Sequence, residues 1–254
     1  MEYTFLSTAE LKGQRSTIRK GQYIAGYAIG IIHLQVWYPL IPGNVVNATT
    51  YNFPVRMKLL QGGTQDKIHR GDPSVLDAII EAGRELQNEG VRAIAGACGY
   101  LGNYQREVAA ALDVPVYLSS LIQVPMIHRG LKPQQRIGIL CADGPALTPS
   151  ILTACGVTSD IPISIMGLEN KPEFSKITYS RGEFDADLIE QEVVESAQQL
   201  VAEHSDTGAI LLECSDMPPF AYAVQRAVQL PVFDFITMIN WLFHSVVQRP
   251  YEGI

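Results

Sequence analysis

Short apolar runs recur along the chain and alternate with longer segments whose apolar residues follow helical spacing. A short apolar run without polar alternation is typical of a strand that is buried on both faces of a parallel sheet. The pattern predicts such strands over residues 27–32, 91–97, 114–118, 136–141, 161–166 and 208–213.

Amphipathic segments lie between these runs. One begins at Asp72 and Pro73, an N-cap and first-turn pair, and ends at Gly90. Its apolar residues, among them Ile79 and Leu86, are spaced to share one face of a helix. Strands that alternate with helices predict right-handed βαβ units and parallel sheets covered on both faces. Further helices are expected near 102–112, near 146–154 and over 185–203.

The chain contains an internal repeat that aligns without a gap. Residues 91–122 and 207–238 each hold an apolar run, a cysteine, a helix-like stretch and a second apolar run with a proline. The cysteine precedes the proline by 17 residues in both copies, which are Cys98 and Pro115, then Cys214 and Pro231. Internal repetition constrains the whole architecture. We therefore expect an α/β protein with two pseudo-symmetric, doubly wound, flavodoxin-like parallel-sheet halves that face a central cleft.

The repeat also predicts the domain organisation. The first half is expected over residues 1–126 and carries Cys98, and the second over 127–254 and carries Cys214, with the last helix packing back on the first half. The polar stretch 167–183 is expected to be a surface excursion or a lid.

Composition and charge narrow the function classes. The 254 residues are 47% hydrophobic and 18% charged, which is ordinary for a soluble globular protein. The formal net charge is −7 and Lys and Arg do not cluster, which argues against a nucleic-acid partner. No apolar stretch approaches the roughly 20 residues that cross a bilayer, and residues 1–4 open no signal peptide. We expect a cytoplasmic protein without a membrane partner.

The four cysteines differ in their settings. Cys98 and Cys214 follow buried strands, at the sheet edge where ligands bind in open parallel sheets. A thiolate and a thiol on opposite walls of a cleft suit a cofactor-free racemase, because a proton leaves one face of a carbon and another returns to the opposite face. For Cys141 and Cys155, packing in an apolar setting is the better interpretation. The spacing of Cys and His matches no zinc motif and no nucleotide motif occurs, so no metal and no cofactor is expected.

Polar residues near the strand ends are candidates for substrate binding. The turn-forming stretch 39–51 is expected to be a long loop, and its Asn and Thr side chains can donate hydrogen bonds to a carboxylate or simply form turns. Helix capping is the alternative role of the serines, and a plain turn is the alternative for the aspartate after strand 136–141. The candidates are Asn44, Asn47, Thr49, Gly99, Tyr100, Ser119, Ser120, Asp143, Ser215 and Asp216.

Two carboxylates flank the second cysteine. Asp216 can tune the Cys214 thiol, or it can be a solvated surface group. Glu213 is unusual at the end of a buried strand, and it would raise the pKa of the thiol if it were ionised nearby.

Three stretches and the duplicated halves resemble the aspartate/glutamate racemase superfamily: P-G-N-V-V-N-A-T-T-Y, G-A-C-G-Y and E-C-S-D-M-P-P. The superfamily includes glutamate, aspartate and hydantoin racemases, maleate isomerase, arylmalonate decarboxylase and an algal dimethylsulfoniopropionate lyase. The resemblance implies a small carboxylate substrate, a homodimer or higher homo-oligomer, and Cys98 and Cys214 as the acid and base residues. The amino-acid racemases typically place Asn-Thr after the first cysteine and Thr after the second, whereas this chain has Gly-Tyr and Ser-Asp.

Three hypotheses follow from these features. The first is a cofactor-independent racemase or epimerase of a small amino acid or related α-substituted carboxylate, with opposed cysteines as acid and base. The second is a lyase that acts by β-elimination, or a cis-trans isomerase, on the same scaffold. The third is a non-enzymatic protein that binds a small anion.

Overall fold

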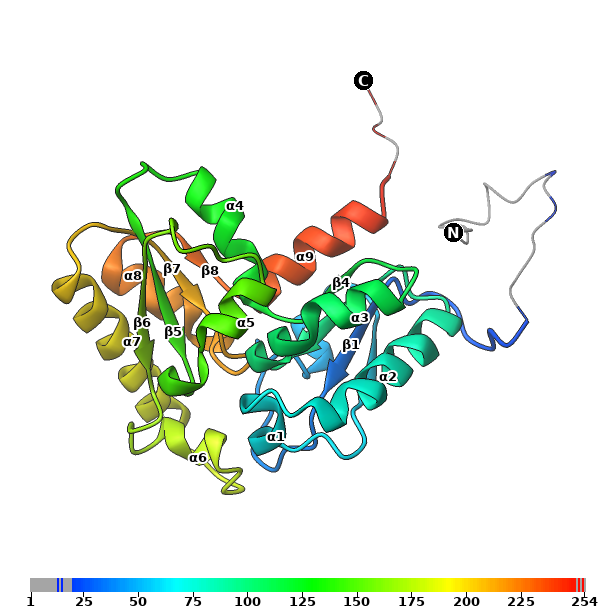
Figure 1. Cartoon of the computed structure of the whole chain (residues 1–254), viewed down its shortest axis with the longest axis horizontal. Helices are drawn as coiled ribbons and strands as arrows, with labels where there is room; N and C mark the ends of the chain where they lie inside the picture. The colour runs from blue at the N-terminus through cyan, green and yellow to red at the C-terminus, as the bar shows by residue number, and fades with distance from the viewer. Residues whose placement is uncertain (1–12, 14, 16–19, 250, 252, 254) are drawn as a thin grey trace.

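Two parallel four-stranded sheets with flanking helices form two halves that lie side by side (Figure 1). The computed structural model describes residues 13, 15, 20–249, 251 and 253, so residues 1–4, to which the signal-peptide expectation refers, lie outside the described residues. The strand order is β2-β1-β3-β4 in the first sheet and β6-β5-β7-β8 in the second. The same order in both sheets, with parallel pairing throughout, confirms the predicted class of two pseudo-symmetric α/β halves.

The first half holds four strands, and its first, third and fourth strands match predicted runs. The strands are β1 (Ile29–His33), β2 (Val55–Leu59), β3 (Ala93–Ala97) and β4 (Val116–Tyr117). The α-helices that precede β5 are α1 (Gln65–His69), α2 (Leu76–Asn88), α3 (Gln105–Ala111) and α4 (Val124–Arg129). Short 3-10 helices are η1 (Ala48–Thr50), η2 (Pro73–Val75), η3 (Gly99–Tyr104) and η4 (Ser120–Gln123). The expected boundary between residues 126 and 127 falls inside α4.

The second half repeats this arrangement. Its strands are β5 (Arg136–Cys141), β6 (Ile163–Gly167), β7 (Thr207–Leu212) and β8 (Val232–Phe233). Its α-helices are α5 (Pro149–Ala154), α6 (Phe174–Thr178), α7 (Ala186–Glu203), α8 (Ala221–Val228) and α9 (Phe235–Val246). Its short 3-10 helices are η5 (Gly144–Ala146) and η6 (Pro218–Phe220).

Strand β2 and helix α1 are among the elements of the first half that the sequence analysis did not predict. Strand β2 reads V-R-M-K-L and is half-buried along its length, because it is an edge strand with one polar face. A search for continuous apolar runs does not find a strand of this kind. Helix α1 is a single short turn that begins after the N-cap Thr64. It matters for function because its last residue, His69, lies in the site described below.

Matching glycines in the two central strands allow a helix to approach each sheet closely. A Cβ at Gly30 in β1 would lie 3.0 Å from the Leu86 side chain of α2, and a Cβ at Gly138 in β5 would overlap Leu200 of α7. Both glycines follow an isoleucine that is fully buried. The two halves therefore use the same packing device, as expected for copies of one unit.

The last helix crosses to the first half. Helix α9 begins with a capping box, in which the Asp234 carboxylate accepts from the Thr237 N–H and the Thr237 hydroxyl accepts from the Asp234 N–H. Its buried face forms one apolar cluster with strands β1 and β3. Each large apolar side chain buried in this way contributes about 1.5–3 kcal/mol. The residues of α9 in this cluster are Phe235, Met238, Ile239 and Leu242.

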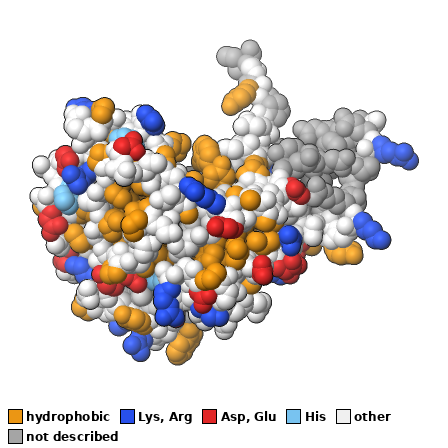
Figure 2. All heavy atoms as spheres, in the orientation of Figure 1, with side chains coloured by type: hydrophobic (Ala, Val, Ile, Leu, Met, Phe, Trp, Pro, Cys, Tyr) orange, Lys and Arg blue, Asp and Glu red, His pale blue; other side chains and the backbone are white. Residues whose placement is uncertain are grey.

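The surface shows mixed charge. Lys and Arg side chains are scattered among acidic and apolar ones on the face drawn in Figure 2. Within the part of the chain that the structure describes, no helix is long and apolar enough to span a membrane.

Candidate active site

The repeat cysteines meet in one small pocket between the two halves. Cys98 directly follows β3 and precedes η3, and Cys214 lies two residues after the end of β7. Both line an inner pocket of about 30 Å³ together with Tyr38, His69 and Asp216. The structure therefore brings together two thiols that are 116 positions apart in the chain. Of the predicted binding residues, Gly99, Tyr100 and Ser215 also line this pocket.

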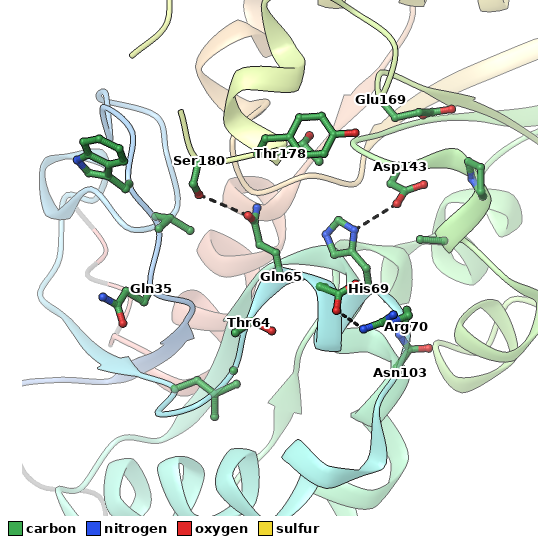
Figure 3. Close-up of a pocket in the computed structure, with 18 of the residues that line it drawn as sticks. Gln35, Thr64, Gln65, His69, Arg70, Asn103, Asp143, Glu169, Thr178 and Ser180 are labelled. Atoms are coloured by element: carbon green, nitrogen blue, oxygen red, sulfur yellow. Dashed lines mark hydrogen bonds and ion pairs between the residues drawn. The ribbon is translucent and has the colours of Figure 1, made fainter. Parts of the chain in front are cut away.

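The inner pocket continues into a wider cleft of about 1350 Å³, drawn in Figure 3. The two spaces share lining residues, among them Gln65 and His69 of the first half and Thr178 of the second. His69 and Asp143 approach each other across the cleft, with 3.4 Å between Nδ1 and Oδ2. The Ser180 hydroxyl donates to the Gln65 side chain over 3.4 Å. Both halves thus contribute walls to the cleft.

The polar stretch 167–183, expected to be a surface excursion or a lid, contributes to the wall of the inner pocket. Ile177 and Thr178 at the end of α6 line that pocket. The stretch is held against the first half by the Gly182 N–H, which donates to the Trp37 carbonyl over 2.8 Å. The Thr178 hydroxyl is buried and has no hydrogen-bond partner among the described residues.

Asp216 is the centre of a buried hydrogen-bond network beside Cys214. Its Oδ2 accepts from the Tyr38 hydroxyl over 3.1 Å and from the Cys214 thiol over 3.5 Å. Its Oδ1 accepts from the Asn44 amide over 2.5 Å, and the Ser215 hydroxyl lies 3.4 Å from Oδ2. Asp216 is 7% exposed, which rules out the solvated alternative. Burial raises the pKa of this carboxyl, and the four donors oppose that rise.

The two thiols have different electrostatic surroundings. Burial raises the pKa of Cys214 far above its ordinary value, and the charge of Asp216 raises it further. Burial also raises the pKa of Cys98, and the charge of Glu213 adds to that rise, but the backbone N–H groups of Tyr100 and Leu101 lower it. Cys98 also keeps partial exposure to the pocket. A thiolate is therefore better supported at Cys98 than at Cys214.

Tyr100, which also lines the inner pocket, connects the two halves by hydrogen bonds. Its hydroxyl donates to the Asp143 carbonyl over 2.8 Å and accepts from the Asp143 N–H over 2.7 Å. The His69 ring lies against the Tyr100 ring, with 3.9 Å between the ring centroids. Burial lowers the pKa of His69, and Asp143 opposes this effect. A neutral imidazole and two phenols therefore supply an aromatic wall around the pocket.

Other predicted residues lie outside the inner pocket and shape its supports. Asn47 accepts from the Thr49 N–H and hydroxyl on the exposed side of the loop, and its amide donates to the Leu40 carbonyl. Ser119 caps η4. The Ser120 hydroxyl donates to the carbonyl groups of Leu212 and Glu213 at the end of β7. These contacts hold loop and strand ends in place.

The sequence analysis did not name several of the lining residues, among them Tyr38, Gln65, His69 and Thr178. Tyr38 precedes the predicted loop by one residue, and its phenol next to a run of turn formers was the available signal. His69 lies on a helix too short for a periodic pattern, and Thr178 lies on the predicted lid. No group of three or more His, Cys, Asp or Glu side chains arranged for a metal ion occurs among the described residues.

We expect the Asp216→Asn variant to alkylate Cys214 at lower pH than the wild type does, because the charge that helps to raise the pKa of Cys214 is removed. The amide has one acceptor oxygen, so at least one of the buried donors loses its partner. That loss should lower the free energy of unfolding by about 1–3 kcal/mol. Iodoacetamide labelling across a pH series, read by mass spectrometry, tests the shift, with the exposed Glu81→Gln as control. An unchanged Cys214 profile would contradict the assigned role.

Comparison with known proteins finds similar sequences and similar folds. No protein-family model matches the chain. The chain is 31% identical over 237 residues to dimethylsulfoniopropionate lyase 3 of Emiliania huxleyi (strain CCMP1516). The aligned region covers 89% of this chain but only 62% of the length of that relative. It is 28% identical over 255 residues to the dimethylsulfoniopropionate lyase of Durusdinium sp. clade D, over 98% of the chain and 84% of the relative.

Solved structures share the fold. A glycine-to-cysteine mutant of arylmalonate decarboxylase, in its sulfate-associated form, aligns with a TM-score of 0.61 at 16% identity, over 88% of this chain and 96% of that one. Picrophilus torridus aspartate racemase aligns with a TM-score of 0.55 at 16% identity, over 89% of this chain and 96% of that one. The two pseudo-symmetric halves thus share the fold of arylmalonate decarboxylase and aspartate racemase, and the sequence of the chain is similar to dimethylsulfoniopropionate lyases.

Proposed function

We propose that the chain is a lyase that eliminates a thioether from a small carboxylate bearing a β-sulfonium group, with dimethylsulfoniopropionate as the first substrate to test. The observation that carries the proposal is the charge of the inner pocket. Two thiols with raised pKa values and the Asp216 carboxyl line it, and none of its described lining residues is Lys or Arg. The similarity to algal dimethylsulfoniopropionate lyases supports the same substrate class.

A cationic substrate group supplies what this pocket lacks. A sulfonium beside Cys98 lowers the pKa of the thiol, because an opposite charge favours the thiolate. The rings of Tyr38 and Tyr100 add favourable contacts with a cation. The wider cleft is also acidic: Asp143 and Glu169 line it, and its Arg70 is paired with Asp66. An acidic entrance attracts a cation.

An amino dicarboxylate fits the same pocket poorly. Two carboxylates would enter a space that already holds Asp216, and each added negative charge would raise the pKa values of the thiols further. A single carboxylate can be held by neutral donors. The unpartnered Thr178 hydroxyl and the Gln65 amide, both at the junction of pocket and cleft, are the side chains placed to do so.

The elimination follows from the placement of the thiols. The Cys98 thiolate takes the proton from the carbon next to the carboxylate, and the C–H electron pair forms the carbon–carbon double bond. The carbon–sulfur bond breaks at the same time or next, and its electrons leave with the neutral thioether. Acrylate remains, and the proton on Cys98 returns to solvent through the cleft. Cys214 stays a thiol, because its contact with Asp216 favours the protonated form.

Racemisation, the first hypothesis of the sequence analysis, is the second candidate because both repeat cysteines line one pocket. A racemase works in both directions and uses its two thiols in interchangeable roles. Here the matching neighbours differ: the second residue after Cys98 is Tyr100, and the second after Cys214 is Asp216, which bonds to the thiol. This asymmetry favours one dedicated base, and we therefore rank the lyase above the racemase.

The test is an assay of the purified chain with dimethylsulfoniopropionate. We expect stoichiometric acrylate and dimethyl sulfide, measured by liquid and headspace gas chromatography. The analogue 3-(methylthio)propionate, whose sulfur is a neutral thioether, is the matched control and should not react, since it lacks the sulfonium leaving group. Deuterium exchange of D- and L-aspartate in heavy water tests the racemase in parallel. Exchange of aspartate with no elimination from the sulfonium compound would reverse the ranking.

A further inference from the structure

Glu213 is a fully buried carboxyl group without a partner. Its side chain is 0% exposed, and neither carboxyl oxygen has a hydrogen-bond partner in the structure. None of the ion pairs formed by the described residues includes Glu213. Buried carboxylates are normally paired or hydrogen-bonded, so an orphan of this kind requires an explanation.

The space for this carboxyl comes from the other half of the molecule. A Cβ at Gly99, the residue after Cys98, would overlap the Glu213 side chain. The two copies of the repeat differ at these positions, because Ala97 matches Glu213 and Ser215 matches Gly99. The second copy therefore has a large acidic side chain where the first has a methyl group, and the first lacks a side chain where the second has one. The acid of one half fills the gap beside the thiol of the other.

The surroundings of Glu213 favour its neutral form. Burial and, to a smaller extent, the charge of Asp143 together raise the pKa of Glu213 to about 8. The charge of Glu213 would in turn be the largest cause, after burial, of the raised pKa of Cys98. Glu213 interacts electrostatically with titratable groups from both halves. They are Cys98 and Tyr100 of the first half, and Cys141, Asp143, Cys155 and Cys214 of the second. None of them carries a positive charge.

We infer that Glu213 is a positioning residue that keeps its proton while Cys98 acts as a thiolate, and that ionisation of Glu213 suppresses formation of the Cys98 thiolate. An ionised Glu213 and a Cys98 thiolate would place two negative charges in one dry region without a counter-ion. Like charges at close range disfavour one another strongly in such surroundings. The inference rests on the proposed function only in taking Cys98 as the reacting thiol.

Alkylation of Cys98 tests the inference without any turnover. Iodoacetamide labels the thiolate, and mass spectrometry reads Cys98 in the wild type and in Glu213→Gln, which keeps the shape but cannot ionise. At about pH 6.5, where Glu213 is protonated, the two proteins should label Cys98 at equal rates. At about pH 9.5 the variant should label it faster by about tenfold, the factor that one unit of pKa carries. Equal rates at both pH values would overturn the inference.

A second measurement covers a variant that fails to fold. In wild-type protein labelled with ¹³C-glutamate, one δ-carboxyl resonance should titrate near pH 8, well above the others. Titration of every glutamate in the ordinary acidic range would overturn the inference. Neither readout depends on the substrate, so a chain that shows both effects but no elimination would keep the role of Glu213 and lose only the proposed lyase reaction.

Discussion

The Cys98→Ala variant is expected to lose roughly 10²- to 10⁴-fold in kcat for elimination, the contribution of a positioned general base. KM should change little, because the substrate is held by groups other than the Cys98 sulfur. Acrylate formation measured over a substrate series separates the two parameters. Cys98→Ser is the sharper variant: its hydroxyl keeps the size of the side chain, but it ionises far less readily than a thiol, so its activity should stay close to that of the alanine variant.

Controls come from the other cysteines. Cys141→Ala and Cys155→Ala remove thiols that are 0% and 4% exposed and lie in the apolar core, so each should cost stability and leave kcat nearly unchanged. For a lyase, Cys214→Ala should lose less than Cys98→Ala. A racemase would lose net turnover with either variant, while each variant would still exchange the α-hydrogen of one enantiomer with deuterium. Full activity of Cys98→Ala would end the assignment of this thiol as the base.

The second large effect concerns stability. The ordinary pKa of Glu213 is about 4.5 and its folded-state pKa is about 8. As the pH rises between these two values, the Glu213→Gln variant should become more stable relative to the wild type. The folded-state pKa is the higher one, so the folded protein binds the proton more tightly than the unfolded chain does. That contribution is fully present below about pH 4.5 and is lost as the pH reaches about 8. Over this pH range, proton linkage changes the difference in free energy of unfolding between the two proteins by up to about 5 kcal/mol.

Urea unfolding at several pH values measures this difference. Asp216 and Asp234, whose pKa values burial also raises, act alike in both proteins and therefore cancel. The exposed Glu203→Gln is the matched control and should follow the wild type at every pH. A constant difference between Glu213→Gln and the wild type from acid to alkaline pH would mean that Glu213 ionises as an ordinary glutamate.

Local pattern was enough to predict the frame of this protein. Continuous apolar runs predicted the central strands β1, β3, β5 and β7, because a strand buried on both faces must be apolar at every position. The spacing from each cysteine to its proline predicted the duplication, since the same spacing in both copies reflects the same succession of strand, helix and strand. Together these placed Cys98 and Cys214 at equivalent strand ends. Edge strand β2 was missed because its alternation carries a weaker signal.

Tertiary structure alone decided what surrounds the thiols. Asn44 and Tyr38 reach Asp216 from positions 172 and 178 residues away, and His69 meets Asp143 across 74 residues. The gap at Gly99 and the acid at Glu213 acquire meaning only when the halves are packed together. Hydrophobic periodicity is a local property that records which face of an element is buried. It carries no information on how the two halves orient against each other. That orientation determines which polar side chains are buried away from water, and which of those have a hydrogen-bond partner.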